Sequence, residues 1–456
     1  MSNSPKNQDD KTLRIVWLGD DFTGAAAVME VLTFSGIPSL LFLDIPTEEQ
    51  LAACAGIEAF GIATLARSHS PEWMETHLPV LFAFLKDTRS DLVHYKICST
   101  LDSSAHTGSI GKAIELALEH FGEATVPVVT GAPELGRYQV YGNLFCSAGD
   151  AVYRLDRHPV MSRHPVTPMH EADVARHLAK QTDIPTRCLD LELLADPAAS
   201  IAFLNQTAAA NICTFDCIDS EHLKRIGKLL WERRGSTRFL VGSQGVEYAL
   251  VAHFAETGRL PAQMSVGSLG PNPRTGVVSG SVSPTTASQI DWARDNGFAA
   301  IRVDAVKLCA SEQDRTAEEL TALKASKQAL SEGLCPLIFT AQGPDDPEVK
   351  RFRATIADQN AANIVIGKSL GRILFKLIGE ADLGRVAVSG GDTSGHVCSE
   401  LGIYALEAAA PTIPGAAICR ARSETALDGL EIALKGGQMG SQDYFGWIRD
   451  GGGARL

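Results

Sequence analysis

Short apolar runs alternate with amphipathic stretches along most of the chain. Residues 13–18, 57–63 and 126–130 are short runs with few polar positions, which predicts strands buried on both faces. Residues 72–86 and 110–120 repeat apolar side chains at helical spacing and predict helices. Because strands and helices alternate, the pattern predicts parallel sheets covered by helices on both faces, which is the α/β fold class.

The same rhythm continues through both halves of the chain. Further strands are predicted at residues 37–43, 91–98, 212–215, 239–241, 276–280, 300–303, 336–340 and 385–388. Further helices are predicted at residues 285–296, capped by Ser283 or Thr285, at 316–332, and over much of 356–378. Residues 154–181 are rich in His and Pro and predict mostly loop, with a helix starting near residue 171.

The length of 456 residues is too great for one ordinary hydrophobic core, so two domains are expected. Residues 261–274 have little periodicity and many turn-forming residues, which marks them as the domain boundary. We therefore predict an N-terminal domain at 11–262 and a C-terminal domain at 275–456. Each is expected to contain a largely parallel sheet flanked by helices.

The amino-acid composition limits the kinds of partner and the cellular compartment that we expect. The formal net charge of -13 argues against nucleic acid and anionic membranes, which attract basic surfaces. The ten cysteines form no CxxC pair, which is typical of free thiols in a reducing compartment. The first ten residues are polar, and no apolar run is long enough to span a membrane. We expect a cytoplasmic protein.

Two adjacent carboxylates follow the first predicted strand. Asp20 and Asp21 lie in the segment 19–24, where the strand passes into a helix, and ligands of open α/β sheets bind at such positions. Adjacent side chains point to different sides, so one Asp is expected to face the site directly. In the structural alternative, one Asp only caps the helix.

Two cations and a hydroxyl follow later strands. Arg67 comes after a predicted strand and could clamp a carboxylate with its forked donors, or form an ordinary surface salt bridge. Lys96 lies within an apolar strand, where an unpaired ammonium is costly, and Ser99 follows three residues later. The alternative for Lys96 is an edge position with its charge reaching solvent.

Three glycine-rich turns occur in the second half, at residues 279–283, 389–395 and 435–440. Each could be an ordinary turn, but together they suggest a shared pocket in which backbone N–H groups approach phosphate closely. Asp392 could hold Mg²⁺ or accept a proton from an attacking hydroxyl. The candidate nucleotide-binding residues within the turn at 389–395 are Gly390, Gly391, Asp392 and Thr393.

Other familiar motifs are absent or incomplete. No GxGxxG is present, which weakens a dinucleotide-dependent oxidoreductase. The sequence 367–369 resembles the end of a phosphate-binding Walker A loop, but Ala362 stands where its first glycine is required. The His- and Pro-rich residues 156–171 lack a helical metal-binding spacing, so loop packing is favoured over a metal site.

Taken together, these segments resemble the four-carbon acid sugar kinases, bacterial enzymes that phosphorylate threonate, erythronate or 3-oxo-tetronate with ATP. The resemblance covers nearly the whole chain. It rests on GDDFTGA at 19–25, YKICST at 95–100, GSIG at 108–111, SGSVS at 279–283, SGGDTSG at 389–395 and KGGQMG at 435–440.

The resemblance implies an acid-sugar-binding N-terminal domain, an ATP-binding C-terminal domain and an active site in the cleft between them. It implies substrate contacts from Asp20, Asp21, Arg67, Lys96 and Ser99, and ATP contacts from Ser281, Gly391 and Gly437. Two motifs depart from the common family pattern, namely KGGQMG at 435–440 and CSTLDS at 98–103. The particular acid is therefore left open.

The predicted reaction is phosphoryl transfer from ATP and Mg²⁺ to a hydroxyl of a small sugar acid. Arg67 and Lys96 would hold the carboxylate, and Asp20 or Asp21 would orient the hydroxyls. The catalytic base is left open among Asp20, Asp21 and Asp392, with Asp392 also a candidate Mg²⁺ ligand. Such transfer depends on positioning and charge neutralisation more than on covalent chemistry.

Two other classes of function remain as alternatives. One is a nicotinamide-dependent oxidoreductase, and the other is a non-catalytic sugar-acid-binding protein. The expected partner is a small-molecule acid sugar, with no nucleic acid and no membrane. The sequence does not define the oligomeric state, and a homodimer stays open.

Overall fold

The computed structural model describes residues 13–206, 210–261 and 267–455. Two compact units divide the chain: the first runs to residue 264 without residues 41–43, and the second consists of 41–43 and 265–456. The predicted boundary segment includes residues 262–266, which lie outside the described residues.

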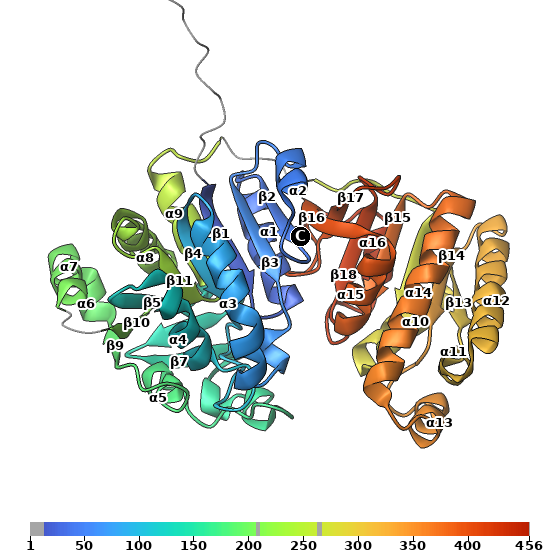
Figure 1. Ribbon diagram of the computed structural model, residues 1–456, viewed down its shortest axis with the longest axis horizontal. Helices are drawn as coiled ribbons and strands as arrows, with labels where there is room; N and C mark the ends of the chain where they lie inside the picture. The colour runs from blue at the N-terminus through green and yellow to red at the C-terminus, as the bar shows by residue number, and fades with distance from the viewer. Residues whose placement is uncertain (1–12, 207–209, 262–266, 456) are drawn as a thin grey trace, which may run out of the picture. The chain divides into compact units, whose positions relative to one another are not determined.

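The first unit is built on a sheet in the order β3-β1-β4-β11-β5-β10-β9 (Figure 1), and β2, whose last two residues belong to the second unit, comes next to β3 in the strand order. Every strand pair with a defined register, from β3 to β9, is parallel. The strands are β1 (Leu13–Gly19), β2 (Ser39–Phe42), β3 (Ala59–Ala63), β4 (Ser90–Lys96), β5 (Thr125–Val129), β9 (Thr186–Leu189), β10 (Asn211–Phe215) and β11 (Phe239–Gly242).

Helices connect these strands, as the sequence pattern predicts. They are α1 (Phe22–Phe34), α2 (Glu48–Ala53), α3 (Pro71–Asp87), α4 (Ile110–Phe121), α5 (Val174–Leu178), α6 (Leu191–Ala195), α7 (Pro197–Asn205), α8 (Ser220–Arg233) and α9 (Gly245–Glu256). The amphipathic α4 buries Ile114 and Ala117 on one face and begins at Ser109, whose hydroxyl caps the amide of Lys112.

A small antiparallel sheet, which the sequence pattern did not predict, accompanies the first unit. It consists of β6 (Arg137–Val140), β7 (Asn143–Ala148) and β8 (Ala151–Arg154). Buried Asp216 supports its first turn by accepting hydrogen bonds from the amides of Tyr141 and Gly142. The predicted loop beyond it contains only short helical turns before α5, so that prediction is confirmed, although α5 begins at Val174.

The second unit has a sheet in the order β13-β14-β12-β15-β18-β17-β16. Its strands are β12 (Thr275–Ser279), β13 (Phe298–Arg302), β14 (Cys335–Phe339), β15 (Arg385–Ser389), β16 (Ile403–Ala410), β17 (Ile418–Ser423) and β18 (Glu431–Lys435). The pairs from β13 to β18 are parallel, whereas β18–β17 and β17–β16 are antiparallel. Leu41 and Phe42 of β2 pair antiparallel with Leu406 and Ala405.

The helices of the second unit also follow the strands. They are α10 (Pro284–Asp295), α11 (Ala305–Ala310), α12 (Glu312–Ser331), α13 (Pro347–Thr355), α14 (Gln359–Ala381), α15 (Gly391–Glu400) and α16 (Tyr444–Arg449). Ser283, and not Thr285, caps α10, because its hydroxyl accepts the amide of Thr286. The core between this sheet and its helices includes Val277, Ile290 and Phe445.

The predicted α/β class, with largely parallel sheets flanked by helices, is confirmed. In both units the parallel strands place their carboxyl ends along one edge, where ligands of open α/β sheets bind. Among the described residues, no helix combines the length and apolar character that a membrane crossing requires.

Candidate active site

Three neighbouring parallel strands of the first unit, β3, β1 and β4, end beside one another. Gly19 at the end of β1 lies opposite Ala63 of β3 and Lys96 of β4. The amide of Asp20 donates to the carbonyl of Lys96 at 2.9 Å, and the amide of Arg67 donates to the carbonyl of Asp20 at 2.9 Å. The fold therefore brings Asp20, Arg67 and Lys96 together from three separate segments.

Arg67 joins both adjacent carboxylates. Its Nε and Nη2 donate to Asp20 at 3.1 and 2.6 Å, and Nη2 also lies 2.7 Å from Asp21 Oδ1. Asp21 additionally caps α1, because its Oδ1 accepts the amide of Gly24 at 2.9 Å. Arg67 thus contacts both carboxylates, and the expectation that one Asp faces the site directly stays a prediction. Its forked donors are occupied by Asp20 and do not stand open as a clamp for a ligand carboxylate.

Lys96 completes this charged cluster. Its ammonium is buried and donates to the carbonyl of Ile97 at 2.7 Å. A Cβ placed on Gly24 would come within 2.5 Å of Asp21 Oδ1 and 2.8 Å of Lys96 Nζ, and 3.6 Å from Arg67 Nη2. Gly24 therefore leaves the space in which these charged groups converge.

Burial and the neighbouring opposite charges shift the pKa values of these groups in opposite directions. Burial raises the pKa of Asp20, although Arg67 acts in the opposite direction. Burial lowers the pKa of Lys96, opposed by the charges of Asp20 and Asp21. Burial also disfavours the charge of Arg67, but the two carboxylates outweigh it and hold the pKa of Arg67 well above its usual value.

Two further segments adjoin this cluster. Ser99 lies half-buried in the loop after β4, three residues beyond Lys96. The turn at Gly108 has a positive φ of 60°, and a Cβ there would come within 2.5 Å of the carbonyl of Arg67. The sequence showed Gly108 as a helix-opening turn, but only the structure shows that it packs against Arg67.

The three glycine-rich turns of the second unit meet at the carboxyl ends of adjacent strands. Strands β12, β15 and β18 are parallel neighbours, with Ser279 opposite Ser389 and Ser389 opposite Lys435. The amide of Gly280 donates to the carbonyl of Ser389 at 3.2 Å, and the amide of Gly390 donates to the carbonyl of Lys435 at 2.9 Å. The sequence-based grouping of these turns therefore corresponds to a real cluster.

Glycine is required at several of these positions. A Cβ at Gly280 or Gly390 would come within 2.4 or 2.8 Å of Thr393 Oγ1, and one at Gly437 within 2.4 Å of Ser281 Oγ. Gly390 also has a φ of 125°, which favours glycine. The close approach of these backbones leaves a surface of amides and hydroxyls suited to an anion.

Gly391 and Asp392 are exposed, whereas Ser281 and Gly390 are buried. The two exposed residues form the first turn of the ten-residue α15. A Cβ at Gly391 would meet no atom within 4 Å. The internal structure therefore does not require glycine at this position, unlike at Gly437.

Lys435 and Thr286 were missed as functional candidates. Lys435 closes β18 beneath the glycine turns, and its Nζ donates to Thr286 Oγ1 at 3.2 Å and to the carbonyl of Gly436 at 3.3 Å. Burial lowers the pKa of Lys435 to about 7. The sequence did contain a signal for Lys435, because it lies at the end of an apolar strand. The same feature identified Lys96 as a candidate.

His158 and His164 of the His- and Pro-rich segment make hydrogen bonds within their own loops, and His164 also lies 3.6 Å from Asp102. His158 Nδ1 accepts the amides of Val160 and Met161, and His164 contacts Thr167 at 2.9 Å. Within the described ranges, no three His, Cys, Asp or Glu side chains are grouped as metal ligands would be.

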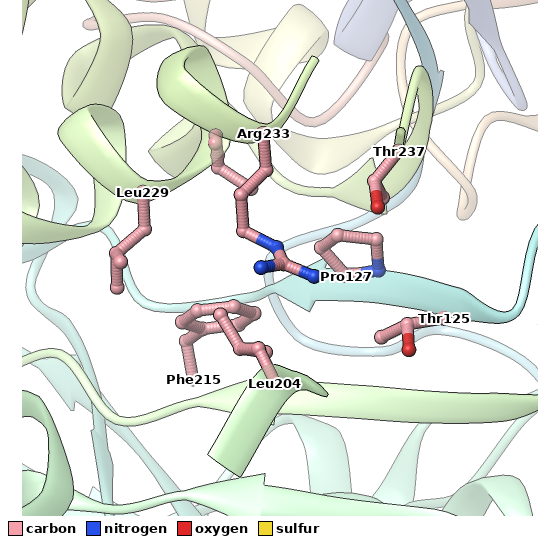
Figure 2. Close-up of a pocket in the computed structure, with 8 residues that line it drawn as sticks. Thr125, Pro127, Leu204, Phe215, Leu229, Arg233 and Thr237 are labelled. Carbon is pink, nitrogen blue, oxygen red and sulfur yellow. The ribbon is translucent and has the colours of Figure 1, made fainter. Parts of the chain in front are cut away.

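A small cavity lies away from both clusters. It is bounded by Thr125, Phe215 and Arg233 among others and encloses about 10 Å³ (Figure 2). That volume is at the limit for one water molecule, so this cavity does not fit a sugar acid or a nucleotide.

Sequence comparison assigns a class to each half of the chain. Residues 15–250 match the family described as a sugar-binding N-terminal domain, and residues 277–445 match the one described as a nucleotide-binding C-terminal domain. A sugar-binding unit followed by a nucleotide-binding unit is the combination that a kinase of small sugar-like molecules requires.

Relatives that match nearly the whole chain show which kinases within this class it resembles. The chain is 42% identical over 446 residues to the 3-oxo-isoapionate kinase of Paraburkholderia graminis, covering 96% of this chain and 94% of the relative. It is 28% identical over 436 residues to a 3-oxo-tetronate kinase of Pseudomonas fluorescens, covering 94% of each. The chain belongs to the four-carbon acid sugar kinase family, as its motifs predicted.

A solved structure has the same fold over nearly its full length. It is a Salmonella typhimurium protein provisionally described as a tRNA synthase, with a TM-score of 0.77 and 25% identity, covering 96% of this chain and 98% of that one. This likeness supports the α/β architecture.

Proposed function

We propose that the protein transfers the terminal phosphoryl group of ATP to a hydroxyl of a small sugar acid. Its relatives are named for 3-oxo-isoapionate and 3-oxo-tetronate, which makes 3-oxo acids the first candidates, ahead of threonate and erythronate. The observation that carries the proposal is the meeting of three glycine-rich turns at the carboxyl ends of β12, β15 and β18. An anion-binding surface of this kind is what a nucleotide phosphate chain requires.

The acid would bind at the charged cluster of the first unit. Lys96 and the Arg67 guanidinium offer positive charge to a carboxylate, while Asp20 and Asp21 offer acceptors to hydroxyls. Ser99 in the following loop adds a hydroxyl contact. Asp21 is the better placed catalytic base, because its side chain is 25% exposed and that of Asp20 only 4%.

The nucleotide would lie against Ser281, Gly390, Gly391, Thr393 and Gly437. Asp392 suits a magnesium ion shared with phosphate oxygens, because Mg²⁺ in phosphate sites commonly takes only one or two protein carboxylates. The ion would neutralise charge on the transferred phosphoryl group. A homodimer remains a separate proposal, which sedimentation of the free protein would test.

The test is a coupled ADP-release assay with ATP and Mg²⁺ against a panel of acids. The panel contains 3-oxo-isoapionate, 3-oxo-tetronate, erythronate and both threonate enantiomers. We expect acid-dependent ADP release with one 3-oxo acid. Asp392→Asn should lower that turnover by about 100-fold or more, because it removes charge at the phosphates, whereas exposed Asp295→Asn on α10 should not.

Other outcomes would favour the alternatives. Tight acid binding without ADP release from any acid would indicate a non-catalytic binding protein. Binding of NADH without binding of ATP would revive the oxidoreductase. Near-normal turnover of Asp392→Asn would remove that residue from the chemistry.

A further inference from the structure

Lys435 is a buried cation without a carboxylate partner among the described residues. Its polar contacts are Thr286 Oγ1 and the carbonyl of Gly436, and the rings of Tyr444 and Phe445 lie 5.9 and 5.8 Å from Nζ. Its residue exposure is 2%. A buried ammonium in this setting is costly unless an anion or a polarised group stabilises it.

Thr286 connects Lys435 with the glycine-rich turns. Its Oγ1 lies 3.1 Å from the hydroxyls of both Ser281 and Ser389, and 2.9 Å from the carbonyl of Gly437. A hydroxyl has one proton and two acceptor positions. As an ammonium, Lys435 can only donate, so it takes one acceptor position of Thr286 Oγ1. The carbonyl of Gly437 also accepts the hydroxyl of Ser283, which leaves the single proton of Thr286 available to Ser281 Oγ.

The hydroxyl of Ser281 is thereby left with a free proton. Its Oγ accepts the amide of Ser283 at 3.2 Å and the hydroxyl of Thr286 at 3.1 Å, which fills both acceptor positions. Among the described residues, no protein group accepts a hydrogen bond from Ser281 Oγ. Ser281 Oγ also lies 2.4 Å from where a Cβ of Gly437 would stand, so this hydroxyl lies against the glycine-rich turn after β18.

We propose that Lys435 is a positioning residue of the nucleotide site, acting through Thr286 to present the proton of Ser281 to an anionic phosphate oxygen. The chain of donors runs from Lys435 Nζ to Thr286 Oγ1, then to Ser281 Oγ and to the phosphate. Hydrogen bonds in such a chain polarise one another, so the buried charge strengthens the last donor. This inference rests on the proposed function, because it places a nucleotide phosphate at Ser281.

The experiment measures dissociation constants of ADP and of adenosine by calorimetry, which requires no acid substrate. Lys435→Met and Thr286→Val each remove one member of the chain at nearly constant volume. We expect both to weaken ADP binding by about tenfold or more, since a hydrogen bond to a charged group is lost. Adenosine, which has no phosphate, should bind each variant about as well as the wild type.

Thr286→Ser is the matched control, because it retains the hydroxyl and should restore ADP binding to within about threefold of the wild type. Ser326→Ala, on α12, removes a buried hydroxyl that donates within its own helix and should not alter binding. In the Ser281→Ala background, Lys435→Met should have little further effect, because the chain already lacks its last donor.

Each contrary result has a distinct meaning. Equal loss of ADP and adenosine binding would show a general structural role for Lys435. Full additivity of Lys435→Met and Ser281→Ala would show that Lys435 does not act through Ser281. Normal ADP binding by both single variants would overturn the inference and leave the kinase proposal intact, whereas a wild type that binds no nucleotide would overturn both.

Discussion

Asp20 and Asp21 are adjacent in the sequence but occupy different environments. Asp20 is buried and holds the forked donors of Arg67, whereas Asp21 caps α1 and keeps part of its side chain exposed. A buried ion pair fixes a geometry, and an exposed carboxylate can meet a substrate. The two residues should therefore separate into a structural and a catalytic role.

We predict that Asp21→Asn lowers kcat by about 100-fold or more with little change in Tm. Asn retains the oxygen that caps α1, but it cannot accept a proton from the attacking hydroxyl. Asp20→Asn should instead lower Tm by several degrees, because it leaves the buried charge of Arg67 without its bidentate partner. Kinetics and thermal unfolding of both variants check this, and a normal kcat for Asp21→Asn would contradict it.

A second residue-scale prediction concerns stability and pH. Burial lowers the pKa of Lys435 to about 7, so the folded state binds fewer protons than the unfolded state between about pH 7 and the ordinary lysine pKa of 10.5. The stability of the wild type therefore rises with pH across that window relative to a variant lacking the amine. Lys435→Met should be the more thermostable of the two at pH 6.5, and this advantage should shrink toward pH 9.5.

The comparison uses nucleotide-free protein. The other titrating groups contribute equally to the pH dependence of stability in the wild type and in Lys435→Met, so their contributions cancel. The groups facing Lys435 are the neutral Thr286 hydroxyl, the Gly436 carbonyl and the two rings, and the Tyr444 hydroxyl donates to the carbonyl of Ala416. An advantage of Lys435→Met that is independent of pH would contradict a buried, titrating amine.

At the scale of strands and helices, periodicity predicted most parallel strands to within about two residues. It succeeded where an apolar run is followed by an amphipathic stretch, as in β4 and α4 or β12 and α10. It missed the sheet at residues 137–154, whose strands are short and only partly buried and whose first turn is held by Asp216. It also missed the antiparallel β16 and β17, because hairpin pairing depends on partners and not on periodicity.

The candidate site likewise contains features that the sequence could predict and features that it could not. Motif residues such as Asp20, Arg67 and Gly437 could be named from the sequence because strand ends and glycines are visible in it. The ion pairs of Arg67 and the contacts of Lys435 could not, since they join segments distant in the sequence. Nothing in the spacing of Thr286 and Lys435 indicates that their side chains meet.

The glycine-rich turns allow a prediction at this scale. Gly437→Ala would place its Cβ 2.4 Å from Ser281 Oγ, so we expect both a lower Tm and a higher KM for ATP. The Cβ added by Gly391→Ala would meet no atom within 4 Å, so Tm should stay unchanged. If phosphate approaches this backbone, the KM for ATP should rise by about tenfold. Gly379→Ala, in the last turn of α14 with open space around it, is the control for both.

Steady-state kinetics with ATP varied and thermal unfolding distinguish these outcomes. A fall in Tm for Gly391→Ala would show an internal constraint that the structure does not contain. An unchanged KM for ATP in Gly391→Ala, with a raised one in Gly437→Ala, would place the phosphates nearer the turn after β18 than the first turn of α15.

At the scale of the whole molecule, we propose that the two compact units bind different ligands. The family matches assign sugar binding to residues 15–250 and nucleotide binding to 277–445, and the charged cluster and the glycine-rich turns lie within those ranges. Each cluster lies at the carboxyl ends of parallel strands in its own sheet, so each unit can bind its ligand through its own residues.

Hydrogen exchange provides the corresponding test, because ligands that bind the native state slow the local opening of the segments they contact. We expect a sugar acid alone to protect amides of residues 20–24, 64–69 and 97–111, and ADP alone to protect those of 280–286, 390–395 and 436–440. Lys435→Met should reduce the protection by ADP and leave that by the acid unchanged, since it alters only the nucleotide site. Protection by ADP at residues 20–24 in the absence of acid, without protection at 436–440, would contradict the assignment of ligands to the two units.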